Sequence, residues 1–279
     1  MPPALAPGAR ARSKTTLVLF MNQMNRRSIL SWLGVMAAGT VASLRARADA
    51  PPRKDARILS FESFRVAHPD HVQSLHTYLE SGVLPALRQV HAGPRMVFEA
   101  LVAPHAPEVL LLSSFSSFEE VLEVNSKMAA NVGTRRTRAG LESASAAVLE
   151  DVQSQLMTVL GDTFCAPAGS QHLRAGVFEL RSYHAAAWQN APPAAVSAIF
   201  ARAGVQPIVN AATAAGEHMP KFTYLIPFES LAARQEAWAR VDADPAWAEL
   251  QRDSIAKCGA RVKVTAKSIY KLAPYSPVA

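Results

Sequence analysis

Hydrophobic residues follow a two-residue period in some stretches of this chain and a helical period in others. From Lys221 to Pro227, aromatic and branched side chains alternate, which predicts a strand buried on at least one face. Leu231, Trp238 and Val241 then follow helical spacing, so they share one apolar stripe. The Asp244-Pro245 pair favours a new helical turn, because Asp caps a helix N-terminus and Pro suits its first position.

The same patterns predict strand, helix, strand, strand, helix, strand, in that order, twice along the chain. The first series has strands at 57–66, 95–102, 109–115 and 152–160, with helices at 69–91 and from 116 onward. The second has strands at 176–183, 205–212, 221–227 and 261–272, with helices at 194–203 and 230–255. Pro85 is expected to kink or interrupt the first helix, because it lacks an N–H and clashes with the preceding turn.

A β-α-β-β-α-β series is the ferredoxin-like arrangement. Short local matches support a duplication, such as Phe61-Glu62 with Phe178-Glu179, although the drift between matches requires insertions. Helices cover one face of each predicted sheet, and the other face is also largely apolar, so it must be buried too. We therefore expect an α+β fold in which two tandem ferredoxin-like units pack sheet against sheet within one chain.

The first 50 residues are typical of an export signal. Arg26-Arg27 precede an apolar run from Ile29 to Leu44, which is about as long as a signal core and short for a membrane span. Ala48-Asp49-Ala50 supplies small residues at both positions of an A-x-A cleavage site. The arginine pair resembles a twin-arginine signal, so we expect a periplasmic protein cleaved after Ala50. An uncleaved N-terminal anchor is the alternative, and Met24 is a candidate for the true start.

The positive charge of the chain is concentrated in this leader. The formal net charge is +7, and residues 1–50 hold seven basic side chains and one acidic one. The other residues carry 22 basic and 21 acidic groups, so the mature body is nearly neutral. A neutral body gives no electrostatic case for binding a polyanion, and we expect no nucleic-acid partner.

Two cysteines remain in the mature chain, Cys165 and Cys258. An exported protein could bridge them, but one pair is too few to indicate a disulfide framework. We interpret them as isolated thiols. The sequence has no C-x-x-C and no metal-type cysteine pattern, so we expect no metal site.

The strand at 177–183, with the sequence Val-Phe-Glu-Leu-Arg-Ser-Tyr, resembles the strand that opens domains of the NIPSNAP family. The resemblance continues through residues 203–207, 224–231, 237–238, 243–247 and 272–277. The first half, where Phe61-Glu62-Ser63-Phe64 lacks the Leu-Arg of the motif, resembles a divergent second copy. The family implies the dimeric α/β-barrel fold, here formed within one chain, and it implies no established reaction. On this resemblance, residues 1–50 are the extension and signal, 51–165 the divergent half and 174–279 the NIPSNAP domain.

Alternation in the 177–183 strand places Glu179, Arg181 and Tyr183 on one face and Phe178 and Leu180 on the other. We expect the two apolar residues to pack on the helices and the polar three to point between the sheets. An isolated buried charge costs several kcal/mol, so these charges must be paired or hydrogen-bonded. Either a polar ligand pocket or a structural ion pair that sets how the sheets meet fits this requirement.

Glu62 has the matching position in the first half, so two carboxylates could face one cavity. Paired carboxylates can act as acid and base, but the sequence does not fix their separation. His184 ends the motif strand and His218 precedes the strand at Lys221, so both suit a barrel mouth. Catalytic residues are unknown, and the candidate ligand-binding residues are Glu62, Glu179, Arg181, Tyr183, His184 and His218.

Other conspicuous residues fit structural roles. His68, His71 and His76 lack the i, i+4 spacing of a zinc pair, which favours surface or capping positions. Trp238 and Trp247 supply large apolar area for packing a helix on its sheet. The chain contains no G-x-S-x-G, P-loop or G-x-G-x-x-G motif.

The sequence therefore predicts an exported NIPSNAP-like protein that binds a small ligand or a partner through its barrel. The alternative is a small oxidative enzyme, monooxygenase-like or haem-binding, that uses the cavity between the sheets; this rests on analogy of fold alone. Whether the protein is an enzyme is left open. No cofactor is predicted, a membrane is expected only through an uncleaved signal, and a homo-oligomer is left open.

Overall fold

The computed structural model describes residues 57–142, 148–160, 176–184, 193–217, 219–258 and 264–277. Outside the described residues lie the expected export signal, Cys165 and His218. The structure also does not describe the side chains of His184 and Cys258. Within the described ranges, no helix is long and apolar enough to cross a membrane.

Both halves of the described chain follow the expected order of elements. The first half contains β1 (Ile58–Val66), η1 (Pro69–His71), α4 (Val72–Tyr78), η2 (Leu79–Val83), α5 (Leu84–Val90), β2 (Arg95–Val102), β3 (Glu108–Phe115), α6 (Phe118–Ala130), α7 (Val132–Glu142) and β4 (Leu149–Val159). The second contains β5 (Val177–His184), α9 (Pro193–Ala203), β6 (Val209–Ala215), β7 (Lys221–Phe228), α10 (Leu231–Ala243), α11 (Pro245–Cys258) and β8 (Val264–Leu272).

Pro85 changes the first helical region without ending it. It stands in the first turn of α5, directly after the π-helical turn η2. The Leu84 N–H reaches back to the Leu79 carbonyl, five residues earlier, which is the π-helical pattern. A proline cannot supply the usual bond to the preceding turn, and the widened turn accommodates it.

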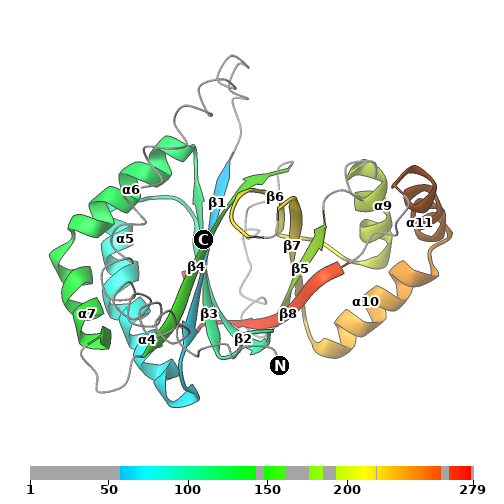
Figure 1. Ribbon diagram of the computed structural model, residues 1–279. Coiled ribbons are helices and arrows are strands. Elements are labelled where there is room, and N and C mark those ends of the chain that lie inside the picture. Colours follow the sequence, from blue (N-terminus) through cyan, green and yellow to red (C-terminus); the bar gives the residue numbers. More distant parts are fainter. Residues whose placement is uncertain are drawn as a thin grey trace, which may run out of the picture. The chain divides into compact units, whose positions relative to one another are not determined.

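The strands close into one antiparallel barrel in the order β1-β3-β2-β8-β5-β7-β6-β4. The expected α+β fold and barrel are therefore confirmed. The two halves are not merely stacked, because β2 pairs with β8 and β4 pairs with β6 to complete the ring. In Figure 1, α4 to α7 lie outside the first-half strands and α9 to α11 outside the second-half strands.

A single apolar cluster lies inside this barrel, and every strand contributes to it. Its largest fully buried side chains include Phe98, Phe178 and Met157. The rings of Phe98 and Phe178 meet edge to face with centroids 4.9 Å apart, so the first and second halves touch at the centre.

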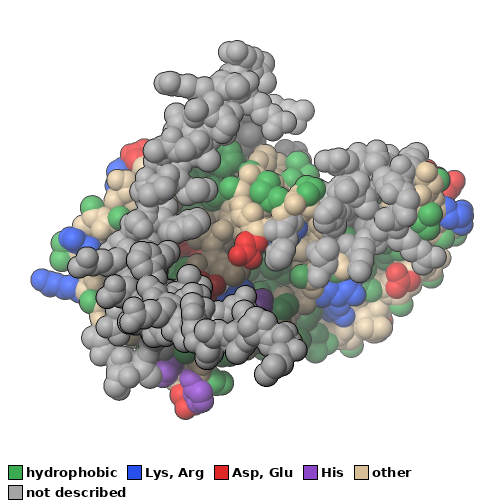
Figure 2. All heavy atoms as spheres, in the orientation of Figure 1, with side chains coloured by type: hydrophobic (Ala, Val, Ile, Leu, Met, Phe, Trp, Pro, Cys, Tyr) green, Lys and Arg blue, Asp and Glu red, His purple; other side chains and the backbone are tan. Residues whose placement is uncertain are grey.

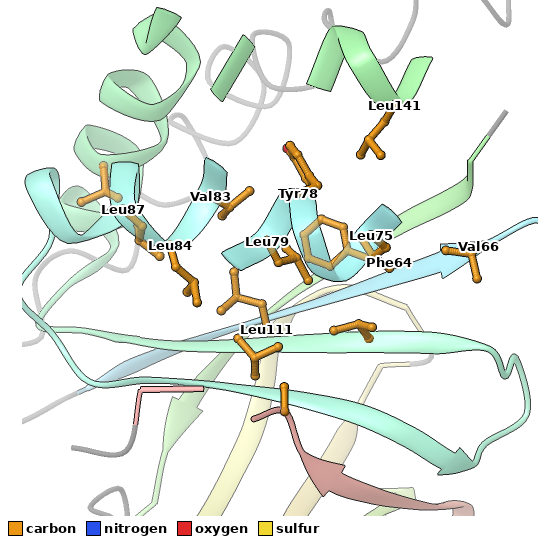
Figure 3. Close-up of a cluster of buried hydrophobic side chains, with 14 of the residues drawn as sticks. Phe64, Val66, Leu75, Tyr78, Leu79, Val83, Leu84, Leu87, Leu111 and Leu141 are labelled. Atoms are coloured by element: carbon orange, nitrogen blue, oxygen red, sulfur yellow. The ribbon is translucent and has the colours of Figure 1, made fainter. Parts of the chain in front are cut away.

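A second cluster lies between the first-half strands and their helices (Figure 3). Leu75, Leu79 and Leu84 from the helical region pack there against Phe64 and Leu111 from the sheet. The second half has its own outer cluster, formed mainly by α9, β7 and α10. The strands therefore contribute apolar side chains both to the interior cluster and to the outer clusters.

One expected boundary was wrong. The strand predicted at 205–212 begins only at Val209, because Pro207 lacks an N–H and the residues before it form turn hydrogen bonds. The helical region predicted at 230–255, with its restart at Asp244-Pro245, is confirmed as two helices that meet at Asp244. The Asp244 carboxylate accepts from the Ala246 N–H at 2.9 Å and caps the second helix, as the Asp-Pro pair predicts.

Candidate functional site

The two faces of the motif strand β5 point in the opposite directions from those expected. Phe178 and Leu180 point into the barrel interior, whereas Glu179 and Tyr183 lie on the side of the helices. The expectation that Glu179, Arg181 and Tyr183 point between the sheets is therefore wrong. Two apolar side chains complete the interior cluster, and the polar ones find partners on α10, so both faces are satisfied.

Glu179 is the centre of an ion-pair cluster under α10. Its side chain is 0% exposed, and it accepts from Arg234 Nη2 at 2.7 Å and Nε at 3.1 Å. Trp238 Nε1 donates to the same carboxylate at 2.6 Å. A buried carboxylate with a bidentate guanidinium and an indole donor is fully satisfied. This geometry corresponds to a structural ion pair, and it fixes α10 on β5 rather than one sheet on the other.

Arg181 and Tyr183 extend this cluster. The Arg181 Nε lies 3.5 Å from Glu179 Oε1, and its guanidinium stacks on the Trp238 ring at 3.6 Å. Burial raises the pKa of Tyr183 to about 12. The fold supplies most of the partners of this cluster, although the buried Arg181 Nε has no hydrogen-bond acceptor among the described residues. A ligand-binding role for these residues stays a prediction.

Glu62 lies on the helix side of β1, because its neighbours Ile58 and Phe64 on the same strand face belong to the outer cluster. Burial raises the pKa of its carboxyl, although part of the residue remains accessible to solvent. Glu62 and Glu179 therefore face different helix layers on different sides of the barrel. The expectation that they share one cavity is wrong, since it assumed that both point inward.

The register of the strands also changes which residues correspond. Ile58 pairs with Phe115 in the first half, and Val177 pairs with Phe228 in the second, each directly before the helix cap. Counting from these pairs, Glu62 corresponds to Arg181 rather than to Glu179. The sequence match of Phe61-Glu62 with Phe178-Glu179 therefore differs by two residues from the correspondence given by strand register. A shift of two residues keeps a side chain on the same face of the strand but moves it along the strand.

The described histidines lie outside the barrel interior. His68 caps η1, where its Nδ1 accepts from the Asp70 N–H at 3.3 Å. His76 is on α4, and His91 follows α5 and stacks on Phe115. No group of three or more His, Cys, Asp or Glu side chains among the described residues is arranged to hold a metal ion.

The barrel interior itself is divided into an apolar end and a polar end. The polar end is where β1 and β5 finish and β3 and β7 begin. Alternation and strand register place these polar side chains inside it: Ser63, Arg65, Glu108, Asp151, Gln153, Ser182, Thr213, Lys221, Thr223 and Ser268. We call this set the polar end. In the orientation of Figure 1, acidic side chains and other polar atoms show at the centre of the visible face (Figure 2).

Glu108 is the buried anion of the polar end. Tyr270 Oη donates to one carboxylate oxygen at 2.6 Å, and Ser63 Oγ donates to the other at 2.7 Å. Both distances are in the range of charge-assisted O–H···O⁻ bonds. Burial and the neighbouring Glu108 charge raise the pKa of Tyr270 well above its ordinary value. Tyr270 thus stays a donor, and a residue of the second half satisfies a carboxylate of the first.

Arg65 is a partly buried cation of the polar end, and only some of its N–H groups have partners among the described residues. Its Nη2 donates to Gln153 Oε1 at 2.9 Å. The nearest carboxylate oxygen is 3.7 Å from Nη1 and belongs to Asp151, whose side chain is 45% exposed against 16% for Arg65. The buried Nε has no acceptor among the described residues. Buried polar atoms are rarely left unpaired, so this position suits a bound molecule.

The second half supplies a wall of hydroxyl groups. Ser182 Oγ and Thr223 Oγ1 lie 3.3 Å apart across β5 and β7. Thr213 Oγ1 is buried and has no hydrogen-bond partner within the described ranges. Lys221 stands at the start of β7, where burial lowers the pKa of its amine and the Glu217 charge partly opposes that effect. The wall therefore offers neutral donors and acceptors beside one amine.

The polar end was not predicted from the sequence, because the wrong face of the motif strand β5 was expected to point into the barrel. Arg65 and Glu108 stand at strand ends and belong to no motif. One signal was available: Arg65 and Thr223 are polar residues that each stand between two apolar neighbours in a strand. Polar side chains on an interior-facing period of two indicate a lined cavity or a network.

Part of the chain matches a known protein family. Residues 175–277 match the family model described as NIPSNAP. A comparison with curated proteins found no match. The described second half, β5 to β8, therefore carries the resemblance seen in the sequence.

Comparison with solved structures gives distant matches. A heme-binding protein from Thermus thermophilus is 12% identical with a TM-score of 0.44, covering 79% of this chain and 92% of that one. A chlorite dismutase from Candidatus Nitrospira defluvii is 10% identical with a TM-score of 0.46, covering 78% and 92%. An uncharacterized NIPSNAP-like domain protein from Burkholderia xenovorans is 11% identical with a TM-score of 0.33, covering 39% and 89%.

Proposed function

We propose that this chain is a NIPSNAP-like protein that binds a small amphipathic molecule in the polar end of its barrel, with an anionic group of the ligand on Arg65. The observation that carries this is the state of Arg65: a mostly buried guanidinium with a free Nε and no carboxylate closer than 3.7 Å among the described residues. A carboxylate is the ligand group that a guanidinium pairs with best, because its oxygens accept two parallel N–H bonds.

The rest of the interior supports an amphipathic ligand. Below the polar end lies the apolar cluster with Phe98 and Phe178 at its centre. Small-molecule sites are mostly apolar with a few placed polar groups. A ligand with a short aromatic or aliphatic body would set that body toward the aromatic rings and its acidic head toward Arg65, Lys221 and the hydroxyl wall.

We propose further that the two halves descend from one β-α-β-β-α-β unit. The barrel order supports this, because the fourth, first, third and second strands of each half are neighbours in that sequence. Ser117 and Ser230 also cap corresponding helices, accepting from the Glu120 N–H at 3.2 Å and the Ala233 N–H at 3.1 Å. On this proposal the second copy, which lies within the matched residues 175–277, retains the family pattern, and the first copy has diverged.

Export by the twin-arginine route is part of the same proposal and rests on residues 1–50. The intact mass of protein recovered from the periplasm tests it. A chain that begins at Pro51 is expected, and a chain that retains the leader contradicts cleavage after Ala50.

Binding is tested by titrating the purified mature protein with matched probes, using calorimetry. We expect 3-phenylpropionate to bind and its neutral amide to bind at least about tenfold more weakly, which corresponds to about 1.4 kcal/mol. Arg65→Gln should remove the difference between acid and amide. Arg88→Gln, which removes an exposed arginine on α5, is the matched control and should leave it. Equal binding of acid and amide by the wild-type protein contradicts the proposal.

The alternative of a small oxidative enzyme has one observation in its favour, the buried Glu108–Tyr270 pair, which places a proton acceptor and a donor inside the barrel. Haem fits the described interior poorly, since the histidine side chains that the structure places lie on helices and loops outside it. Absorbance of the purified protein separates the cases. A Soret band would favour the haem-binding alternative over a ligand held by Arg65.

A further inference from the structure

Four titratable side chains meet outside the barrel, where the end of the chain crosses the first half. Tyr275 Oη lies 2.7 Å from Nδ1 of His76 on α4. On the other side of the same ring, His76 Nε2 lies 3.4 Å from Glu99 Oε2 on β2. Lys271 Nζ on β8 lies 3.1 Å from that same oxygen. The four form a continuous line of proton-carrying groups from a phenol to a half-exposed amine.

The order of these contacts sets the tautomer of His76. An ionised carboxylate only accepts hydrogen bonds, so Glu99 favours the imidazole form with its hydrogen on Nε2. Nδ1 then carries the lone pair and accepts from the Tyr275 hydroxyl. Lys271 Nζ lies against the same carboxylate. The phenol is thus bonded to one ring nitrogen of an imidazole whose other nitrogen faces a carboxylate.

The surrounding chain holds Tyr275 in this position. The Ala273 N–H donates to the Val97 carbonyl at 2.9 Å, and the Val97 N–H donates to Ser276 Oγ at 2.8 Å. Ala273 and Ser276 are buried on either side of the tyrosine. The rings of Tyr275 and His76 meet edge to face with centroids 5.5 Å apart. A donor and an acceptor held in this way can transfer a proton without first reorienting.

The electrostatics oppose loss of the phenolic proton to solvent. Burial, followed by the charges of Glu80 and Glu99, raises the pKa of Tyr275 above its ordinary value. A process that keeps the phenol oxygen neutral and places the proton on the imidazole is therefore preferred to one that makes a phenolate.

We infer that Tyr275 is a one-electron redox site whose proton passes to His76 as the electron leaves. The phenol gives one electron to a soluble metal(III) complex, which is reduced to the metal(II) complex. The O–H proton moves to Nδ1 of His76, leaving a neutral phenoxyl radical and an imidazolium beside Glu99. Return of one electron and the same proton restores the starting state, and this inference does not depend on the proposed ligand.

Tyr270 provides the internal comparison. It also donates to a base, the Glu108 carboxylate at 2.6 Å, but it lies inside the barrel and is only 3% exposed. Tyr275 remains partly exposed. A soluble oxidant reaches Tyr275 and not Tyr270. Both tyrosines have a proton acceptor, so comparing them isolates the effect of access to the oxidant.

The test is flash oxidation of the mature protein by tris(bipyridine)ruthenium(III), followed by electron paramagnetic resonance and transient absorption in H₂O and D₂O. We expect a tyrosyl radical that Tyr275→Phe removes and Tyr270→Phe keeps. His76→Phe should slow radical formation by about tenfold or more, equivalent to about 1.4 kcal/mol of barrier, and should remove the deuterium effect. Glu99→Gln keeps the imidazole, removes the carboxylate that stabilises its charged form, and should slow the reaction less.

Two outcomes overturn the inference. One is a radical signal that survives unchanged in Tyr275→Phe. The other is a rate and a deuterium effect that His76→Phe and Glu99→Gln leave as in the wild type, with unfolding curves showing that both variants are folded. A purely structural role for the Tyr275–His76 bond would change the unfolding curves and leave the deuterium effect in place.

Discussion

Glu62 and Glu179 differ in the donors that surround them. Both are acids on the helix side of a central strand. Glu179 accepts from Arg234 and Trp238, whereas no donor among the described residues reaches Glu62. The free energy of a buried carboxylate is set by such partners more than by its depth. The two acids therefore contribute to stability with opposite signs.

We predict that Glu62→Gln stabilises the protein at neutral pH. Burial raises the pKa of this carboxyl in the folded state, so the folded protein binds the proton more tightly than the unfolded chain does. Its stabilising contribution is present below the ordinary carboxyl pKa, about 4.3, and is lost as pH rises through the folded value. Urea unfolding at several pH values measures this.

The free energy of unfolding of the wild-type protein should fall as pH rises above about 4.3. In the Glu62→Gln variant this fall should be smaller. Glu150→Gln, an exposed acid on β4, is the control and should change the unfolding free energy by no more than about 0.5 kcal/mol. A Glu62→Gln variant that is less stable than the wild type at pH 7 would contradict the reasoning.

At the scale of elements, α10 is positioned by a charged contact as well as by apolar packing. Arg234 and Trp238 on this helix both donate to Glu179 on β5, while Ala237 and Val241 pack into the outer cluster. The contact is specific in direction, since a bidentate guanidinium requires one orientation of the carboxylate.

We predict that Glu179→Gln destabilises the fold strongly. Removing one partner of a buried pair costs about 3–5 kcal/mol, and the lower part of that range applies because Arg234 is a fifth exposed and can reach water. Glu236→Gln, which loses an exposed pair with Arg240 on the same helix, should cost no more than about 0.5 kcal/mol. Chemical unfolding followed by circular dichroism measures both; equal small effects would contradict the cluster's role.

Most elements could be predicted from the sequence, because period and capping act locally. The strands β1 and β7 and the caps at Ser117 and Ser230 follow directly from alternation and cap residues. The start of β6 was missed because Pro207 interrupts an apolar run. The face of β5 was missed because both of its faces are buried, and alternation assigns residues to faces without saying which face is inside.

At the scale of the whole molecule, closure of the barrel decides where chemistry is available. The sequence indicates two sheets with apolar inner faces, but the seams β2–β8 and β4–β6 depend on pairings between distant segments that no local pattern encodes. Closure brings Tyr270 of the second half to Glu108 of the first. It also leaves Arg65 inside the ring with an Nε that no described residue pairs with, and Arg65 is the centre of the proposed site.

Native mass spectrometry of the protein purified from cells, with wild type and Arg65→Gln compared, tests this central claim most directly. We predict a wild-type species that carries one small bound molecule, which acid denaturation releases and negative-mode fragmentation identifies as a carboxylate. Arg65→Gln should appear mainly without it, and Arg88→Gln should retain it. A wild-type protein that is always free of bound mass, or an Arg65→Gln variant that carries the same molecule in the same amount, would contradict the account.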